Sequence, residues 1–350
     1  MPLDASTRPT PDGERLVFRW DLDKTYLKSE FETLREMMRI PFEKAEDKVA
    51  APGVAALLRG LREAALSSGR SMRVYFLSAS PPQIGRAIRR KLELDGIIYD
   101  GIVFKDQLQR IMRGKFRHLR EHIGYKLTEL LKARVAEPPA AREYLFGDDW
   151  ESDPLIYSLY ADVVAGRVDA ATLGELLRAV RVDPPLIEQA CTLAAELQPS
   201  DAVARIFINL ERRTPPARLR VYGLRLVPAF NYLQTAACLY EDGALSAAGV
   251  VQVARSLLED SDYVPERLAN SIADIERRGH LGAGAAQRVR ATLQASGLLP
   301  ATPAPRLWAR ARRWWANRRL RGAPVPSLNG SRIDYRTLVG LELPGEGGSE

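Results

Sequence analysis

Short apolar runs that end at polar or acidic turns are the feature that most constrains how this chain folds. Each run has the β-branched and aromatic composition of a buried strand. Helical periodicity separates the runs, as at Asp47–Ser67 and Gln83–Leu94. Strands that alternate with helices predict a mainly parallel sheet covered by helices on both faces. The predicted strands are Arg15–Asp21, Met72–Leu77, Ile97–Phe104, Glu143–Phe146 and a short fifth, Asp162–Ala165.

Beyond about residue 169, apolar residues recur at three- and four-residue spacing, which is typical of amphipathic helices. Leu173, Leu176 and Leu177 begin this pattern, which continues to Leu299 with prolines between the segments. The length of 350 residues also favours two domains over one. We therefore expect a Rossmann-like α/β domain at 14–168 and an all-α C-terminal domain at 169–299. The remaining parts are expected to be a flexible N-terminus at 1–13 and, at 300–350, a linker, a basic segment and a flexible tail.

The sequence lacks the features of an exported or membrane-spanning protein. Residues 1–15 have no apolar signal-peptide core, and polar side chains interrupt the most apolar stretch at 224–240. Cys191 and Cys238 are the only cysteines, which argues against a disulfide scaffold and against thiolate metal sites. We expect a cytoplasmic protein that is peripheral at a membrane if its basic segment binds lipid.

That basic segment carries most of the formal charge of +7, because seven arginines and no acid lie between Arg306 and Arg321. Trp308, Trp314 and Trp315 lie among the arginines. A helix here would place most arginines opposite the tryptophans. Three interpretations stay open: packing onto the protein body, contact with an anionic membrane and, ranked below these, binding to nucleic acid.

The residues that indicate chemistry follow the predicted strands. In a parallel sheet, ligands bind beyond the carboxyl ends of the strands, and Asp21, Ser78 and Asp148 all lie at that edge. Asp21 and Asp23 are two residues apart, so one carboxylate can attack while the other transfers a proton. A carboxylate attacks a phosphate dianion only if the charge is neutralised, normally by Mg²⁺. The alternative is an ordinary polar turn after a strand.

Two further groups complete this pattern. The acids Asp148, Asp149, Glu151 and Asp153 follow one strand so closely that they would repel each other without a cation, which favours Mg²⁺ over a solvated acidic loop. Ser78 would bind a phosphoryl oxygen or cap the next helix. Lys126 would balance the negative charge, with Lys105 and Lys115 as alternatives.

The motifs in this part of the chain are Asp21–Thr25, Leu77–Pro81, Tyr125–Leu127, Gly147–Pro154 and the following Leu155–Tyr157. In this order they resemble the haloacid dehalogenase superfamily and, within it, the catalytic domain of the actin-patch phosphatidate phosphatase family. The resemblance covers about residues 14–168. Lys24 departs from the family, where a second acid is common, as does Asp149, where a serine is common.

The resemblance implies a role for each catalytic residue. Asp21 would be the nucleophile, and Asp23 would act first as general acid and then as general base. Thr25 would orient Asp23, Ser78 would hold a phosphoryl oxygen, and Lys126 would neutralise Asp21 and the phosphate.

The resemblance also implies a Mg²⁺ site. Asp21, the backbone carbonyl of Asp23, Asp148 and Asp153 would be the ligands, with Asp149 either assisting or lying one shell further out. The motif spacing leaves little room for the large cap that encloses small substrates in this superfamily, so an open site for a bulky substrate is expected. The alternative is that the helical region after Asp169 folds back as a lid.

We therefore predict a Mg²⁺-dependent phosphomonoester hydrolase that forms an aspartyl-phosphate and acts on phosphatidate or a related phospholipid. The alternatives are a binding or scaffold protein on a phosphatase fold and a phosphatase that acts on nucleic-acid ends.

Overall fold

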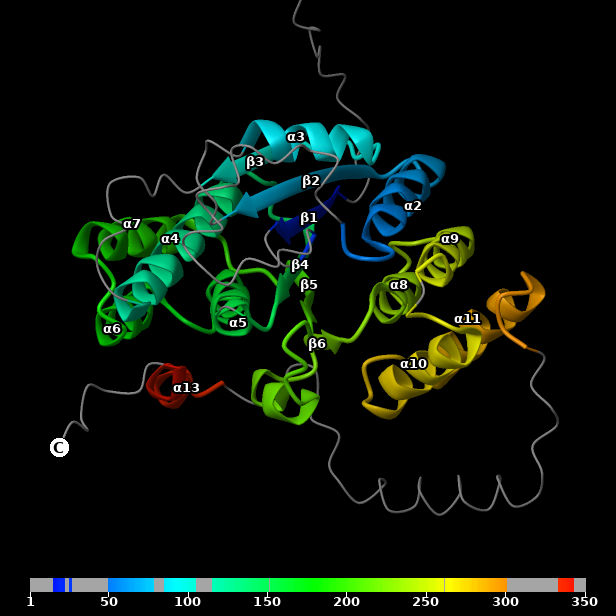
Figure 1. The fold of residues 1–350 in the computed structure, drawn as a ribbon. Coiled ribbons are helices and arrows are strands. Elements are labelled where there is room, and N and C mark those ends of the chain that lie inside the picture. The colour runs from blue at the N-terminus through cyan, green and yellow to red at the C-terminus, as the bar shows by residue number, and fades with distance from the viewer. Residues whose placement is uncertain are drawn as a thin grey trace, which may run out of the picture.

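The computed structural model describes residues 15–22, 25–26, 50–78, 85–104, 115–150, 152–260, 262–300 and 333–342. A sheet of six parallel strands runs through the molecule in the order β3-β2-β1-β4-β5-β6 (Figure 1). The two central strands, β1 and β4, are therefore neighbours although about 120 residues separate them. The strands are β1 (Arg15–Asp21), β2 (Ser71–Ser78), β3 (Gly101–Phe104), β4 (Arg142–Asp148), β5 (Val203–Asn209) and β6 (Leu226–Ala229).

Helices cover both faces of this sheet (Figure 1). On one face lie α2 (Val54–Ser67), α3 (Gly85–Leu94), α8 (Tyr232–Glu241), α9 (Ala247–Leu258), α10 (Pro265–Arg277) and α11 (Ala283–Ala295). On the other lie α4 (Lys115–Val135), α5 (Asp153–Val164), α6 (Ala170–Ala179), α7 (Pro184–Glu196), the 3₁₀ helix η4 (Pro216–Tyr222) and α13 (Tyr335–Glu342). No helix among the described residues is both long enough and apolar enough to cross a membrane.

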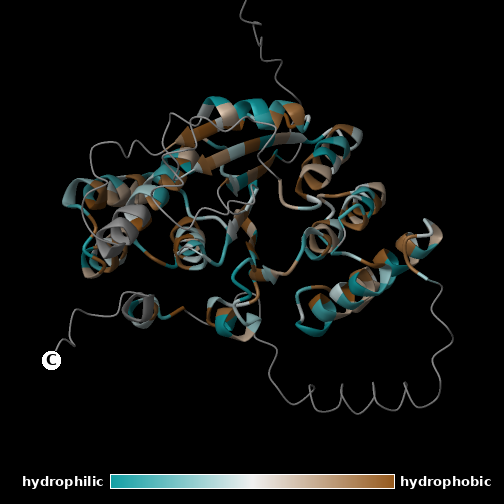
Figure 2. Ribbon diagram, in the orientation of Figure 1, coloured by the Kyte–Doolittle hydropathy of each residue, from teal (hydrophilic) through white to brown (hydrophobic). Residues whose placement is uncertain are grey.

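The alternation of side chains along the central strands builds a separate core on each face. Phe18 and Trp20 of β1 point into the core beside α2 and α8, where the Trp20 ring stacks on Phe146 of β4 at 3.8 Å between ring centroids. Leu145 of β4 points to the opposite core, beside α4 and α5. In Figure 2, hydrophobic residues colour much of the strands, whereas the helices alternate between hydrophobic and hydrophilic turns.

The predicted fold class, an α/β protein with a Rossmann-like core and a mainly parallel sheet followed by a helical region, is confirmed. One predicted strand is wrong, because Asp162–Ala165 is not extended: Asp162 to Val164 form the end of α5. Every residue of α5 is buried, so the segment shows no polar face. A short run such as this, apolar after Asp162, does not distinguish a buried helix from a strand.

The region after residue 169 also differs from the expected all-α domain. β5 and β6 lie within it and extend the same sheet, so the sheet crosses the boundary predicted at 168. Arg205 interrupts the apolar pattern of β5, and β6 has only four residues, one of which is Pro228. These features concealed the two strands among helices.

The segment 300–350 differs from its prediction as well, since α13 lies in the part expected to be a flexible tail. Tyr335 at the start of α13 is buried and donates a hydrogen bond to Asp162 Oδ2 at 2.7 Å. The basic segment Arg306–Arg321 lies outside the described residues, and its interpretations stay predictions.

Candidate active site

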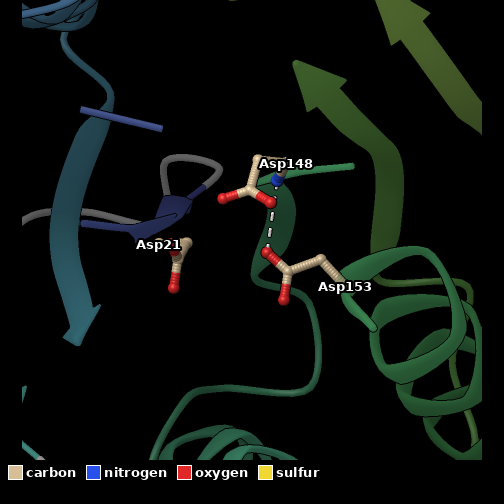
Figure 3. A group of neighbouring side chains, drawn as sticks. All are labelled: Asp21, Asp148 and Asp153. Atoms are coloured by element: carbon tan, nitrogen blue, oxygen red, sulfur yellow. Dashed lines mark hydrogen bonds between the residues drawn. The ribbon is translucent and has the colours of Figure 1, made fainter. Parts of the chain in front are cut away.

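Three buried carboxylates meet at the carboxyl edge of the sheet. Asp21 is the last residue of β1 and Asp148 is the last residue of β4, and these two strands are paired. Asp153 begins α5, immediately after the β4 turn. Each contributes one oxygen to a set whose members all lie within 4.8 Å of one another (Figure 3). We call Asp21, Asp148 and Asp153 the acid cluster.

Lys126 of α4 extends its ammonium group into the acid cluster. Its Nζ lies 2.8 Å from Asp21 Oδ1 and also bonds to Asp153 Oδ1. Its side chain is 3% exposed, so water does not screen these contacts strongly. The side chains of the two alternatives, Lys105 and Lys115, lie outside the described part of the chain. Among the side chains that are described, Lys126 is the lysine that bonds to the predicted nucleophile.

These four side chains bring more carboxylates than ammonium groups into one place. Three carboxylates and one ammonium lie together, and all four are at most 3% exposed. Buried carboxylates are costly unless hydrogen bonds or cations satisfy them. Carboxylate oxygens are the ligands that Mg²⁺ and Ca²⁺ prefer. The acid cluster therefore fits a divalent cation by its donor atoms and by their close approach.

Gly147 allows Asp153 to approach β4. A Cβ atom at position 147 would lie 2.2 Å from Asp153 Oδ2 and 2.7 Å from the Tyr157 ring, closer than real contacts permit. With glycine there, Asp153 Oδ2 accepts a hydrogen bond from the Asp148 backbone N–H at 3.3 Å. In the sequence Gly147 marked only the end of a strand; its position directly before the acids was the signal of a close approach.

Two buried tyrosines border the acid cluster, and the sequence did not single them out. Burial first, and then the charge of Asp153, raises the pKa of Tyr157 well above its usual value, and the Lys126 Nζ lies 5.2 Å from its ring centroid. Burial also raises the pKa of Tyr232 well above its usual value. Tyr232 donates a hydrogen bond to the Thr25 backbone carbonyl at 2.6 Å. Both phenols therefore stay protonated at neutral pH.

The other predicted catalytic residues are placed only in part. Ser78 is buried at the end of β2, at the same edge as Asp21, since Asp21 pairs with the preceding Leu77. Thr25 is also buried. Asp23 lies outside the described residues, so the orientation of Asp23 by Thr25 stays a prediction.

Asp149 has different contacts from those of the acid cluster. Its Oδ1 accepts the Arg212 backbone N–H at 2.8 Å, and its Oδ2 accepts the Thr214 backbone N–H at 2.9 Å. It therefore anchors the connection that follows β5. Asp149 was predicted as an alternative metal ligand, but the structure does not place it among the three clustered acids.

Comparison with known families identifies the part of the chain that carries this site. Residues 20–174 match the family described as phosphatidate phosphatase APP1, catalytic domain. The resemblance inferred from the motifs is confirmed. The matched range contains the acid cluster, Ser78 and Lys126, and it ends before β5. No curated protein and no solved structure matches the chain significantly.

Proposed function

We propose that this protein is a Mg²⁺-dependent phosphomonoester hydrolase of the haloacid dehalogenase type, with a phosphorylated lipid such as phosphatidate as its substrate. The observation that carries the proposal is the convergence of Asp21, Asp148, Asp153 and Lys126 in one buried site. This site lies within the range that matches a phosphatase catalytic domain.

The metal would be held by Asp21, Asp148 and Asp153, with the Asp23 carbonyl as a further ligand and Asp149 outside the coordination sphere. When bound, Mg²⁺ supplies positive charge that offsets the phosphoryl oxygens and polarises the phosphorus toward attack. The three carboxylate oxygens that lie within 4.8 Å of one another support this assignment.

The reaction has two displacement steps. In the first, a carboxylate oxygen of Asp21 forms a bond to phosphorus while the bond to the alcohol oxygen breaks, and Asp23 gives its proton to that oxygen. In the second, Asp23 takes a proton from water as the water oxygen bonds to phosphorus. The bond between Asp21 and phosphorus then breaks, which releases inorganic phosphate and restores both carboxyl groups.

Lys126 and Ser78 hold the reacting groups. The ammonium group of Lys126, bonded to Asp21 Oδ1, keeps that carboxylate oriented. Ser78 would donate its hydroxyl proton to a phosphoryl oxygen at the edge of β2. The lipid class of substrate rests on the description of the matched family.

Phosphate release tests the proposal directly. The purified chain with Mg²⁺ is expected to hydrolyse p-nitrophenyl phosphate and short-chain phosphatidate, and Asp21→Asn to lose about 10³-fold or more in kcat, since the amide is not a nucleophile. Asp162→Asn is the matched control, because Asp162 is another largely buried, ion-paired carboxylate, with Arg167 and Arg225 as its partners. Equal rates for Asp21→Asn and the unmodified chain would leave a non-catalytic binding protein as the better account.

A further inference from the structure

Beside the acid cluster, three neighbouring strands end in exposed aromatic and arginine side chains. Trp150 follows β4 and is 39% exposed, and Phe230 follows β6 and is 45% exposed. Between them, Arg212 follows β5 and is exposed. We call Trp150, Arg212 and Phe230 the rim. β4 and β6 are two strands apart, about 10 Å in a regular sheet, so the rim is one continuous surface.

Contacts with neighbouring residues hold the side chains of the rim in place. The Arg212 guanidinium lies over the Trp150 ring at 4.8 Å from its centroid, and Arg278 lies over the Phe230 ring at 5.6 Å. The backbone of Arg212 is fixed by its hydrogen bond to Asp149. Asp149 therefore has a positioning role, holding Arg212 over Trp150.

The rim is also connected to the chemistry. Trp150 donates its backbone N–H to Asp148 Oδ1 at 2.6 Å, so this residue of the rim lies next to an acid of the cluster. A molecule whose phosphoryl group reached the acid cluster would have its remaining part close to the rim. The rim is thus placed to contact what surrounds the scissile phosphate.

The charge of the connection from β5 to β6 favours an anionic partner. Between residues 210 and 225 there are five arginines and one acid, Glu211. Tryptophan and arginine together are typical of surfaces that enter the headgroup region of a membrane, where the ring is partly buried in lipid and the guanidinium meets phosphate.

We infer that the rim is a membrane-contact surface that docks on anionic phospholipid next to the active site. This inference rests on the proposed function for its orientation, since docking here would bring the acid cluster to a phosphate at the lipid surface. Arg212 would bind lipid phosphates, and Trp150 and Phe230 would enter the interface. Asp149 would keep Arg212 in place.

The test compares the pair Arg212→Ala with Phe230→Ala against a matched pair, Arg288→Ala with Tyr240→Ala, in the full chain. Arg288 also lies over an aromatic ring, at 5.9 Å from the Tyr240 centroid, but Tyr240 is in the last turn of α8, away from the helix end that follows β6. Both pairs remove one positive charge and one aromatic ring. Both leave Arg306–Arg321 intact, so any lipid binding by that segment is common to them.

Each variant is assayed on phosphatidate in phosphatidylcholine vesicles and on p-nitrophenyl phosphate. For the rim pair, the vesicle rate is expected to fall about tenfold, because one basic and one aromatic contact with lipid are lost. The p-nitrophenyl phosphate rate is expected to stay within about twofold, since the surface does not act in the chemical steps. The control pair should change neither rate by more than about twofold. Equal losses on both substrates, or no selective loss on vesicles, would overturn the inference.

Sedimentation with the same vesicles separates this inference from the proposed function. If the unmodified chain hydrolyses neither substrate, the proposed function fails. Vesicle binding alone then tests whether the rim contacts the membrane. Weaker sedimentation of the rim pair than of the control pair supports the rim. Equal sedimentation of the two pairs overturns it, as does loss of binding to a phosphorylated oligonucleotide with vesicle binding unchanged.

Discussion

Two buried groups of charges involve the same two central strands, and their compositions are opposite: one is rich in acids and the other in arginines. The acid cluster has three carboxylates and the Lys126 ammonium. Deeper along the same strands, Glu143 of β4 bonds to Arg19 of β1 at 3.0 Å and to Arg134 of α4 at 3.3 Å. We call Arg19, Arg134, Glu143 and the hydrogen-bonded Tyr160 the inner ion network.

In the inner ion network, the single acid is Glu143, and the donors that bond to it are side chains of the protein. Burial raises the pKa of Glu143, but the charge and hydrogen bonds of Arg19 outweigh it, and the resulting pKa lies below the usual value. Tyr160 adds a hydrogen bond to Glu143 at 2.6 Å. The acid cluster, by contrast, brings three carboxylate oxygens to within 4.8 Å of one another, as a set that could hold a metal ion. The comparison favours a structural role for the inner ion network and, under the proposed function, a ligand-binding role for the acid cluster.

The largest expected effect comes from removing the ammonium group of the acid cluster. Lys126→Met should lower kcat on p-nitrophenyl phosphate about 10³-fold, because a preorganised positive charge next to the nucleophile is lost. Lys91→Met is the control, since Lys91 also bonds to an aspartate, Asp95, at 2.7 Å but lies on α3. A loss of similar size in both variants would contradict a catalytic role for Lys126.

A substitution in the inner ion network should lower the stability of the fold and leave the activity unchanged. Glu143→Gln leaves two buried arginines without their counter-charge, so the free energy of unfolding should fall by about 3 kcal/mol. Urea denaturation measures this loss, and activity per folded molecule should stay near that of the unmodified chain. If the variant were stable but inactive, the distinction between the two charge groups would be wrong.

Gly147→Ala should disturb the acid cluster without changing its charge. The added methyl group overlaps Asp153, and a displacement of that carboxylate by about 1 Å should cost about 10²-fold in activity. Gly284→Ala serves as the control, because its Cβ would meet nothing closer than 3.6 Å. Unchanged kinetics in Gly147→Ala would show that the position of Asp153 does not matter for the reaction.

Mild acid should destabilise the fold through His280. Burial, followed by the charge of Arg278, lowers the pKa of His280 to about 4. The unfolded chain binds a proton near pH 6.5 and the folded chain only near pH 4, so stability should fall as the pH drops through this window, by about 3 kcal/mol. Thermal unfolding between pH 7 and 4 measures how steeply stability changes with pH, and this dependence should be weaker in His280→Gln. An equal pH dependence in both proteins would mean that other groups cause the loss of stability.

The positions of the candidate site residues were largely predictable from sequence. Asp21, Ser78 and Asp148 each follow an apolar strand, and parallel strands bring their carboxyl ends to one edge whatever their separation along the chain. Lys126 was less certain, because a lysine on a helix is usually solvated. Only the packing of α4 against the sheet brings it to Asp21.

Other features depend on contacts that no local pattern reports. Asp149 follows Asp148 directly and has the same chemistry, yet its oxygens bond to the backbone of Arg212 and Thr214, more than 60 residues away. β6 is too short to stand out, and only its pairing with β5 defines it as a strand. Tyr335 lies in a polar, Gly-rich terminal region, and it is buried because α13 packs against α5 and α6, where its hydroxyl bonds to Asp162.

Titration calorimetry with Mg²⁺ tests the central claim, that the acid cluster binds a divalent cation, without relying on turnover. The unmodified chain is expected to bind Mg²⁺, and Asp148→Asn should bind it about tenfold or more weakly, because one charged oxygen ligand is lost. Glu143→Gln should bind it as the unmodified chain does. Equal Mg²⁺ affinity in Asp148→Asn and the unmodified chain would contradict the account.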